Sequence, residues 1–299
     1  MSHPPAEVDL DDAVVRGLLA DQHPDLATEA LGERFEGWDN VAIRLGARRA
    51  VRLPRVATAA PLIEREIRWL PRMSRGWAFG APVPERVGEP GRGYPWRWTV
   101  VPWFEGADAA VEALDADGAE DLGRALRQVH TPAPDDAPDT PWRTRPLRDR
   151  ADTTSEGLAG LARLCAEGGH AWDEAATRAA LAEAADLAWR GDTWVHADVH
   201  LKNLIVRGGR LAAIVDWGEA AAGDPAQDAG QLWLALDGRL VDRAFDAYGP
   251  VDEAFLARAR GEAIATAVRL LGTGDAAFMA SGWNGLTNLG LADGAGPGA

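Results

Sequence analysis

Residues 194–228 read WVHADVHLKNLIVRGGRLAAIVDWGEAAAGDPAQD, and this stretch decides the fold. It contains a His-x-Asp-x-x-x-x-Asn motif and, further on, an Ile-Val-Asp motif. Phosphoryl transfer needs one carboxylate to orient and deprotonate a hydroxyl, and an amide oxygen and a second carboxylate to hold Mg²⁺ against nucleotide phosphates. We therefore predict Asp198 as the catalytic base and Asn203 and Asp216 as the magnesium ligands.

The spacing between these motifs predicts how the chain brings them together. Two short apolar runs, at 204–206 and 211–215, are separated by a turn that contains Gly208 and Gly209. Such a pattern is typical of a β-hairpin. The hairpin returns the chain, and we expect it to place Asp216 beside the loop that carries the other two groups.

The match extends over a longer set of residues. It comprises His196-Ala197-Asp198-Val199-His200-Leu201-Lys202-Asn203, Asp216-Trp217-Gly218-Glu219 and Gly223-Asp224-Pro225-x-x-Asp228, and it resembles the aminoglycoside phosphotransferase family of small-molecule kinases. The resemblance implies an α+β, protein-kinase-like bilobal fold, with a small β-rich N-lobe and a larger, mostly helical C-lobe. Protein kinases carry Asp-Phe-Gly and Ala-Pro-Glu instead. The resemblance therefore implies a small-molecule acceptor.

The same resemblance divides the chain into two domains. Residues 1–103 are expected to form the N-lobe, with an N-terminal helix, an antiparallel sheet and an αC-like helix. Residues 104–299 are expected to form the helical C-lobe, with the catalytic loop and the metal-binding hairpin. Apolar spacing predicts the N-terminal helix within 8–20, and alternating patterns predict strands at 41–45 and 50–53.

The resemblance also implies how the nucleotide phosphates are bound. In the family, the third strand supplies a cation to the phosphates, and a glutamate of the αC-like helix holds that cation. Arg52 stands where the family has lysine and is the expected phosphate contact, with Arg44 and Arg55 as alternatives. Glu66 is the expected partner, within a helix predicted to start at a proline. Asn40, after a turn with one glycine, is a further candidate donor to a phosphate.

A hinge is predicted where a strand-like run ends at Val101 and Pro102. In the family, backbone groups of the hinge hydrogen-bond the adenine. Pro102 has no N–H, so the donor has to come from Trp103 or Phe104.

Helical patterning follows the hinge. Residues 131–146 interrupt it with a stretch rich in proline and aspartate, which we interpret as a connector, with a substrate-side loop as the alternative. The predicted helices lie at 119–130, 151–166, 174–189, 225–236, 239–247, 252–271 and around 275–289.

Several polar residues of the motif are interpreted as structural. His196 and His200 are expected to support the loop by hydrogen bonds rather than to act as acids or bases. Asp224 is expected to cap the helix that begins near Pro225. Asp228 is expected to brace the loop rather than to contact substrate.

Composition narrows the class of protein. The net charge of −15, from 46 acidic and 31 basic side chains, makes a nucleic-acid partner unexpected, because such a partner needs a basic face. An acidic surface attracts polycations, which suits an aminoglycoside-like substrate, and it equally favours solubility. The single cysteine, Cys165, excludes intrachain disulfides and is expected to lie in the core. With no long apolar run and no signal-peptide pattern, we expect a cytoplasmic protein without a membrane partner.

These observations lead to a functional hypothesis. We expect ATP or GTP, bound with Mg²⁺ between the lobes, to phosphorylate a hydroxyl of a small molecule, first of all an antibiotic. A metabolite kinase of the choline or homoserine type is an alternative. A nucleotide-binding pseudokinase with a regulatory role is another, because arginine replaces the usual lysine. No obligate protein partner is evident from the sequence.

Overall fold

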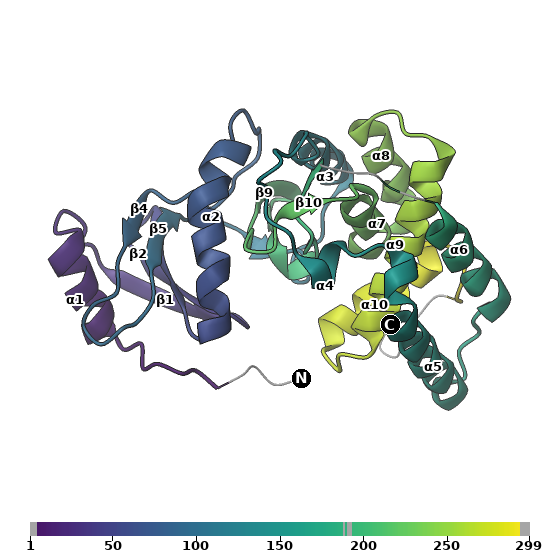
Figure 1. The fold of residues 1–299 in the computed structure, drawn as a ribbon, viewed down its shortest axis with the longest axis horizontal. Helices are drawn as coiled ribbons and strands as arrows, with labels where there is room; N and C mark the ends of the chain where they lie inside the picture. Colours follow the sequence, from purple (N-terminus) through teal and green to yellow (C-terminus); the bar gives the residue numbers. More distant parts are fainter. Residues whose placement is uncertain (1–4, 188, 190–192, 294–299) are drawn as a thin grey trace. The chain divides into compact units, whose positions relative to one another are not determined.

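The computed structural model describes residues 5–187, 189 and 193–293, and these residues form two compact units (Figure 1). The sheet unit comprises residues 5–105 and 214–219. The helical unit comprises residues 106–213 and 220–293. The predicted α+β class, with one β-rich part and one mostly helical part, is confirmed.

The sheet unit is built on five antiparallel strands in the order β1-β2-β3-β5-β4. Its first three strands follow one another through short turns, and the second and third are the two strands that the alternating pattern predicted. The strands are β1 (Leu31–Glu36), β2 (Asn40–Leu45), β3 (Arg49–Pro54), β4 (Arg86–Gly88) and β5 (Trp98–Pro102).

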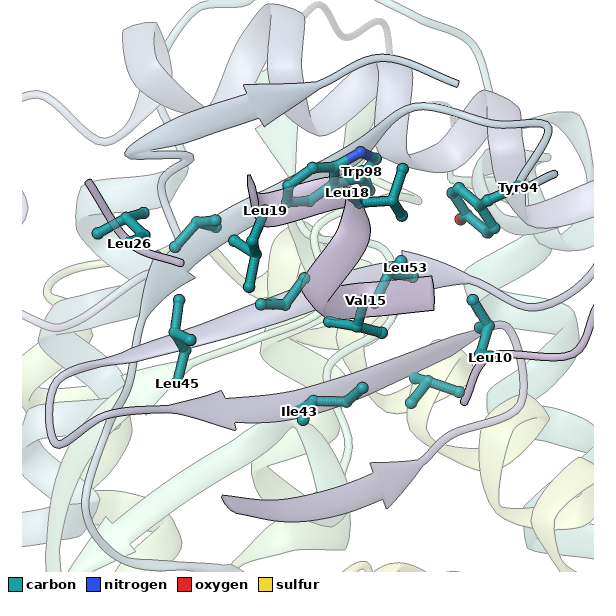
Figure 2. Packing of buried hydrophobic residues seen from close by; sticks show 13 residues of the cluster. Leu10, Val15, Leu18, Leu19, Leu26, Ile43, Leu45, Leu53, Tyr94 and Trp98 are labelled. Atoms are coloured by element: carbon teal, nitrogen blue, oxygen red, sulfur yellow. The ribbon is translucent and has the colours of Figure 1, made fainter. Parts of the chain in front are cut away.

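Helix α1 (Asp12–Gln22) covers one face of this sheet. Figure 2 shows Leu18 and Leu19 of the helix beside Trp98 of the sheet, in one buried cluster with Ile43. All four side chains are at most 1% exposed. Burial of each such side chain contributes about 1.5–3 kcal/mol, so this contact fixes the helix on the sheet.

The opposite face of the sheet carries Arg52. Successive side chains of a strand point to opposite faces. Val51 and Leu53 of β3 belong to the core under α1, so Arg52 between them points to the other face. There it contacts Glu66 of α2 (Ala60–Met73).

The helical unit is organised around α9 (Glu253–Leu271), which packs against four other helices. Cys165 is buried on one of them, as expected, and burial raises the pKa of its thiol. The other helices are α3 (Ala116–Val129), α4 (Pro141–Thr144), α5 (Ala151–Gly168), α6 (Glu174–Asp186), α7 (Ala226–Ala235), α8 (Gly238–Tyr248) and α10 (Ala276–Asn288). Short 3₁₀ turns lie at Leu147–Arg150 and Leu201–Asn203 in this unit and at Ala57–Ala59 in the sheet unit.

Five short strands complete the secondary structure. The predicted hairpin is confirmed as β8 (Leu204–Arg207) and β9 (Arg210–Ile214). Gly208 and Gly209 both have positive φ, 59° and 74°, which is the requirement of the two-residue turn that matches strand twist. The remaining strands are β6 (Ala107–Asp108), which pairs with β8, and β7 (Thr193–Val195) and β10 (Ala221–Gly223), which pair with each other.

Three predicted boundaries were wrong. Helix α1 begins only after its N-cap Asp11, whose carboxylate accepts a hydrogen bond from the backbone of Val14. Helix α6 ends at Asp186 rather than at Trp189, whose indole N–H instead donates to Gly223 O at 3.1 Å. The 131–146 linker contains the short helix α4.

Membrane-spanning helices were also sought. Among the described residues, every helix is too short or too polar to cross a lipid bilayer.

Candidate active site

The loop that carries the predicted base is anchored by Asp228 of α7. One carboxylate oxygen of Asp228 accepts from His196 N at 2.6 Å and the other from Ala197 N at 2.9 Å. Ala197 has a φ of 65°, in the left-handed region that costs energy for a residue with a side chain. Asp228 is fully buried and also contacts Nε2 of His130 at 3.2 Å. These bonds fix the strained backbone one residue before Asp198.

Asp198 lies in the helical unit among positively charged groups. Its Oδ1 forms an ion pair with Arg143 of α4 at 2.8 Å, and its Oδ2 lies 3.6 Å from His200 Nε2. Burial alone would raise the pKa of Asp198, but His200 and Arg143 outweigh it and hold that pKa below its ordinary value. Asp198 is therefore ionised at neutral pH, as a proton acceptor must be.

Asn203 is fixed next to this carboxylate. Its side-chain nitrogen donates to Asp198 O at 3.0 Å and contacts His200 Nε2 at 3.1 Å. Because the nitrogen is engaged on both sides, the amide oxygen is the atom available to a ligand. His196 accepts from Asp198 N at 3.2 Å through Nδ1. Both histidines thus contact the loop, as the sequence analysis expected.

In the sheet unit, Arg52 links two carboxylates. It forms an ion pair with Glu66, and its Nη2 donates to Asp216 Oδ1 at 2.6 Å. Glu66 is 1% exposed, and its second oxygen accepts from Trp217 N at 2.7 Å. Asp216 has a φ of 64°, so its backbone is also held in the left-handed region. The expected contact between Arg52 and Glu66 is therefore present, with Asp216 as a third member.

The charges of this cluster are mutually dependent. Burial by itself would lower the pKa of Arg52, but the two carboxylates raise it. Burial raises the pKa of Glu66 above its ordinary value, against the opposing charge of Arg52. The alternatives to Arg52 lie in other contacts, Arg44 with Glu105 at 2.5 Å and Arg55 with Gly37 O at 3.1 Å.

The other predicted nucleotide residues also lie in the sheet unit. Asn40 begins β2, and its side-chain oxygen is buried without a hydrogen-bond partner. Val101 and Pro102 end β5. The N–H of Trp103 donates to Arg48 O at 2.8 Å, so it is already engaged, which leaves Phe104 as the expected donor to a base. Their role toward a nucleotide stays a prediction.

A cavity of about 370 Å³ opens on Asp198 in the helical unit. Sequence reasoning missed most of its wall, above all Arg143, Arg150 and Arg269. The interpretation of the 131–146 linker as a connector was wrong, because its helix α4 places Arg143 on the base. The available signal was a pair of arginines, Arg143 and Arg145, within an acidic, proline-rich stretch. The spacing carried no information on the partner of Arg143.

Each unit, taken by itself, offers an oxygen donor of the kind that Mg²⁺ binds. Asp216 keeps its second oxygen for a ligand, and Asn203 keeps its amide oxygen. Among the described residues no three His, Cys, Asp or Glu side chains cluster as a metal cage. Mg²⁺ uses few protein oxygens and completes its shell with water and substrate phosphates, so a cage is not required.

The remaining motif residues support the loop and its neighbours. Asp224 caps the start of α7 by accepting from Ala226 N at 3.0 Å, and it also binds Arg258 at 2.7 Å. Lys202 pairs with Asp275 at 2.7 Å.

An ionised carboxylate beside an amide in the helical unit, and a cation bound to an αC-like glutamate in the sheet unit, are groups that kinase-type phosphotransferases use. The model of the phosphotransferase enzyme family matches residues 32–262. That match spans well over half of the chain, so the chain belongs to this family and is a small-molecule kinase. No curated protein sequence matches it significantly.

Solved structures show the same fold. The GDP complex of wild-type aminoglycoside 2'-phosphotransferase-IIIa is 15% identical, with a TM-score of 0.62 over 93% of this chain and 98% of that one. Macrolide 2'-phosphotransferase MphH from Brachybacterium faecium is 20% identical, with a TM-score of 0.57 over 91% and 96%. The streptomycin-ATP-APH(2")-IIa ternary complex is 16% identical, with a TM-score of 0.56 over 92% and 95%. The predicted protein-kinase-like bilobal fold is thereby confirmed.

Proposed function

We propose that this enzyme transfers the γ-phosphoryl group of ATP or GTP to a hydroxyl of a small molecule, in the first place an antibiotic. One observation carries the proposal: the ionised Asp198 opens onto a cavity of about 370 Å³, a size suited to a small-molecule acceptor. The similar solved structures include aminoglycoside and macrolide phosphotransferases, which supports an antibiotic acceptor. A cytoplasmic location, where both nucleotides are available, is part of the proposal.

Asp198 acts as the general base in this proposal. Its Oδ1 is held by Arg143, so Oδ2 receives the proton of the acceptor hydroxyl. The hydroxyl oxygen forms a bond to the γ-phosphorus while the bond from that phosphorus to the β,γ-bridging oxygen breaks. The diphosphate leaves with the electron pair of the broken bond. Positioning and charge neutralisation supply most of the rate.

The remaining residues bind the donor. Asn203 and Asp216 would hold Mg²⁺, which neutralises charge on the phosphates when it is bound. Arg52 would contact the phosphates while Glu66 holds it. Arginine stays charged and can bind phosphate with two parallel hydrogen bonds, so it is suited to the place of the usual lysine. Asn40 would contribute a further phosphate contact, and the segment from Val101 to Phe104 would contact the base.

A transfer assay tests the proposal. The protein is incubated with γ-labelled ATP or GTP and panels of aminoglycosides, macrolides, peptide and nucleoside antibiotics, and hydroxylated metabolites. Label is expected on one acceptor class, and Asp198→Ala is expected to abolish it while nucleotide binding persists. Nucleotide binding without transfer to any class would favour the pseudokinase instead. Full activity of Asp198→Ala would contradict the assignment of the base.

A metabolite kinase is the second candidate. It is favoured by the arginines in the cavity wall, because a polycationic antibiotic would meet like charge there. Transfer to a metabolite and to no antibiotic would identify it.

A further inference from the structure

The wall of the cavity is basic although the chain carries a net charge of −15. Arg143, Arg150 and Arg269 all line it. Two of these charges are compensated, Arg143 by Asp198 at 2.8 Å and Arg150 by an ion pair with Glu262. The charge of the third arginine, Arg269, is therefore the one available to a ligand in the cavity.

Arg269 has no such counter-ion. It lies near the end of α9, and within the described part of the chain no carboxylate forms an ion pair with it. Loss of water around its guanidinium and repulsion from Arg143 and Arg150 lower the pKa of Arg269, and the attraction of Asp198 at longer range offsets them only in part. Arginine nevertheless stays protonated in proteins, so a positive charge remains in the wall.

The acidic residues of the cavity are already engaged. Asp198 is bound by Arg143, and Asp228 accepts two backbone N–H groups and contacts His130. Neither carboxylate is therefore available as a partner for an ammonium group of the acceptor without the loss of a bond. The cavity lacks the spare negative charge that a polycation needs.

We propose that the acceptor carries a carboxylate, which Arg269 binds while the hydroxyl of the same molecule lies at Asp198. This inference rests on the proposed function, because it assigns the cavity to the acceptor. A guanidinium matches a carboxylate with two parallel hydrogen bonds. Trp142, which is 61% exposed, offers a flat apolar face in the same wall to the rest of the molecule. The substrate class is thus a hydroxy acid with an apolar or planar part.

Binding of an acid and of its uncharged amide tests whether the site recognises a carboxylate. The probes are 3-phenyllactate, which has a hydroxyl, a carboxylate and a ring, and its uncharged amide. Calorimetry is performed on the full chain, as wild type, Arg269→Gln and Arg260→Gln. Arg260 is an exposed arginine of the same helix that does not line the cavity, so it is the matched control.

The acid is expected to bind the wild type and Arg260→Gln equally, and to bind Arg269→Gln roughly 10- to 100-fold more weakly, the range of a charge-assisted hydrogen bond. The amide should bind all three alike. Equal binding of acid and amide by the wild type would overturn the proposal. So would loss of MgATP affinity in Arg269→Gln, because it would assign this arginine to the nucleotide.

The transfer assay separates this inference from the proposed function. Phosphorylation of neutral or polycationic acceptors, with a kcat/KM that Arg269→Gln does not change, would overturn the proposal of a carboxylate-bearing acceptor. It would leave the proposed kinase function standing. Absence of all Asp198-dependent transfer, with Arg269-dependent binding of the acid, would overturn the kinase and support the anion site. Thermal unfolding of Arg269→Gln checks the fold, and a Tm at least equal to the wild type is expected because an unpaired charge is removed.

Discussion

Asp198 in the helical unit and Asp216 in the sheet unit are each bound by one arginine, but the two arginines are held very differently. Arg52 lies on a strand inside the unit, is 11% exposed, and binds a second carboxylate on α2. Arg143 lies on the four-residue helix α4, is 25% exposed, and binds Asp198 alone. The Arg52 pair belongs to the regular secondary structure of the sheet unit. The Arg143 pair depends on a short helix within a proline-rich segment.

This difference shows what each arginine is able to do. If Asp216 bound a metal ion in place of Arg52, Arg52 would keep Glu66 and with it its position. Among the described residues, Asp198 is the carboxylate that forms an ion pair with Arg143 and no second one does, so the charge of Arg143 acts on Asp198 directly. We therefore expect Arg52 to matter for stability and nucleotide binding, and Arg143 for the protonation of the base.

The largest expected effect separates the two aspartates. Asp198→Asn removes the proton acceptor while it keeps the shape of the side chain, and kcat should fall roughly 10²- to 10⁴-fold with little change in nucleotide affinity. Asp216→Asn should instead weaken MgATP binding and raise the Mg²⁺ concentration that is needed. Steady-state kinetics and calorimetry measure both. Equal changes in kcat and in MgATP affinity in the two variants would show that the two aspartates do not have separate roles.

The next effect concerns the scaffold. Arg52→Gln leaves Glu66 buried without its cation, and the free energy of unfolding should fall by roughly 3–5 kcal/mol. Arg52→Lys keeps the charge and should lose less. Arg143→Gln should lose about 1 kcal/mol or less, because its pair is partly exposed. Urea denaturation at neutral pH measures all three. If Arg143→Gln lowered the free energy of unfolding as much as Arg52→Gln, the two arginines would not differ in their contribution to stability, and the comparison would be wrong.

A pH profile tests whether Arg143 sets the ionisation of Asp198. The pKa of Asp198 lies below its ordinary value partly because of Arg143, so the wild-type base stays ionised as the pH falls. In Arg143→Gln that pKa rises, and the acidic limb of kcat/KM should move to higher pH. Arg260→Gln should leave the limb in place. An unmoved limb in Arg143→Gln would show that His200 and His196 alone set the ionisation of the base.

The sequence predicted the pair of Arg52 and Glu66 but not the pair of Arg143 and Asp198, and the reason is physical. Arg52 and Glu66 occupy regular positions on a strand and a helix, and periodicity together with the family resemblance identifies such positions. Arg143 contacts Asp198 across more than fifty residues from a proline-rich segment, and Arg269 lines the same cavity from the far end of α9. No local pattern encodes contacts of that kind. The hairpin between Asn203 and Asp216 was predictable because two adjacent glycines dictate its turn.

The last expected effect lies in that hairpin, whose two glycines form a matched pair. Both have positive φ, so Gly208→Ala should cost about 1–2 kcal/mol through backbone strain alone, since nothing lies within 4 Å of its added Cβ. In Gly209→Ala the added Cβ would also lie 2.5 Å from the carboxylate of Asp115, which caps α3. Gly209→Ala should therefore be the less stable variant in urea denaturation. Equal losses would show that the cap of α3 gives way without cost, and that the hairpin is fixed by its turn rather than by the helix beside it.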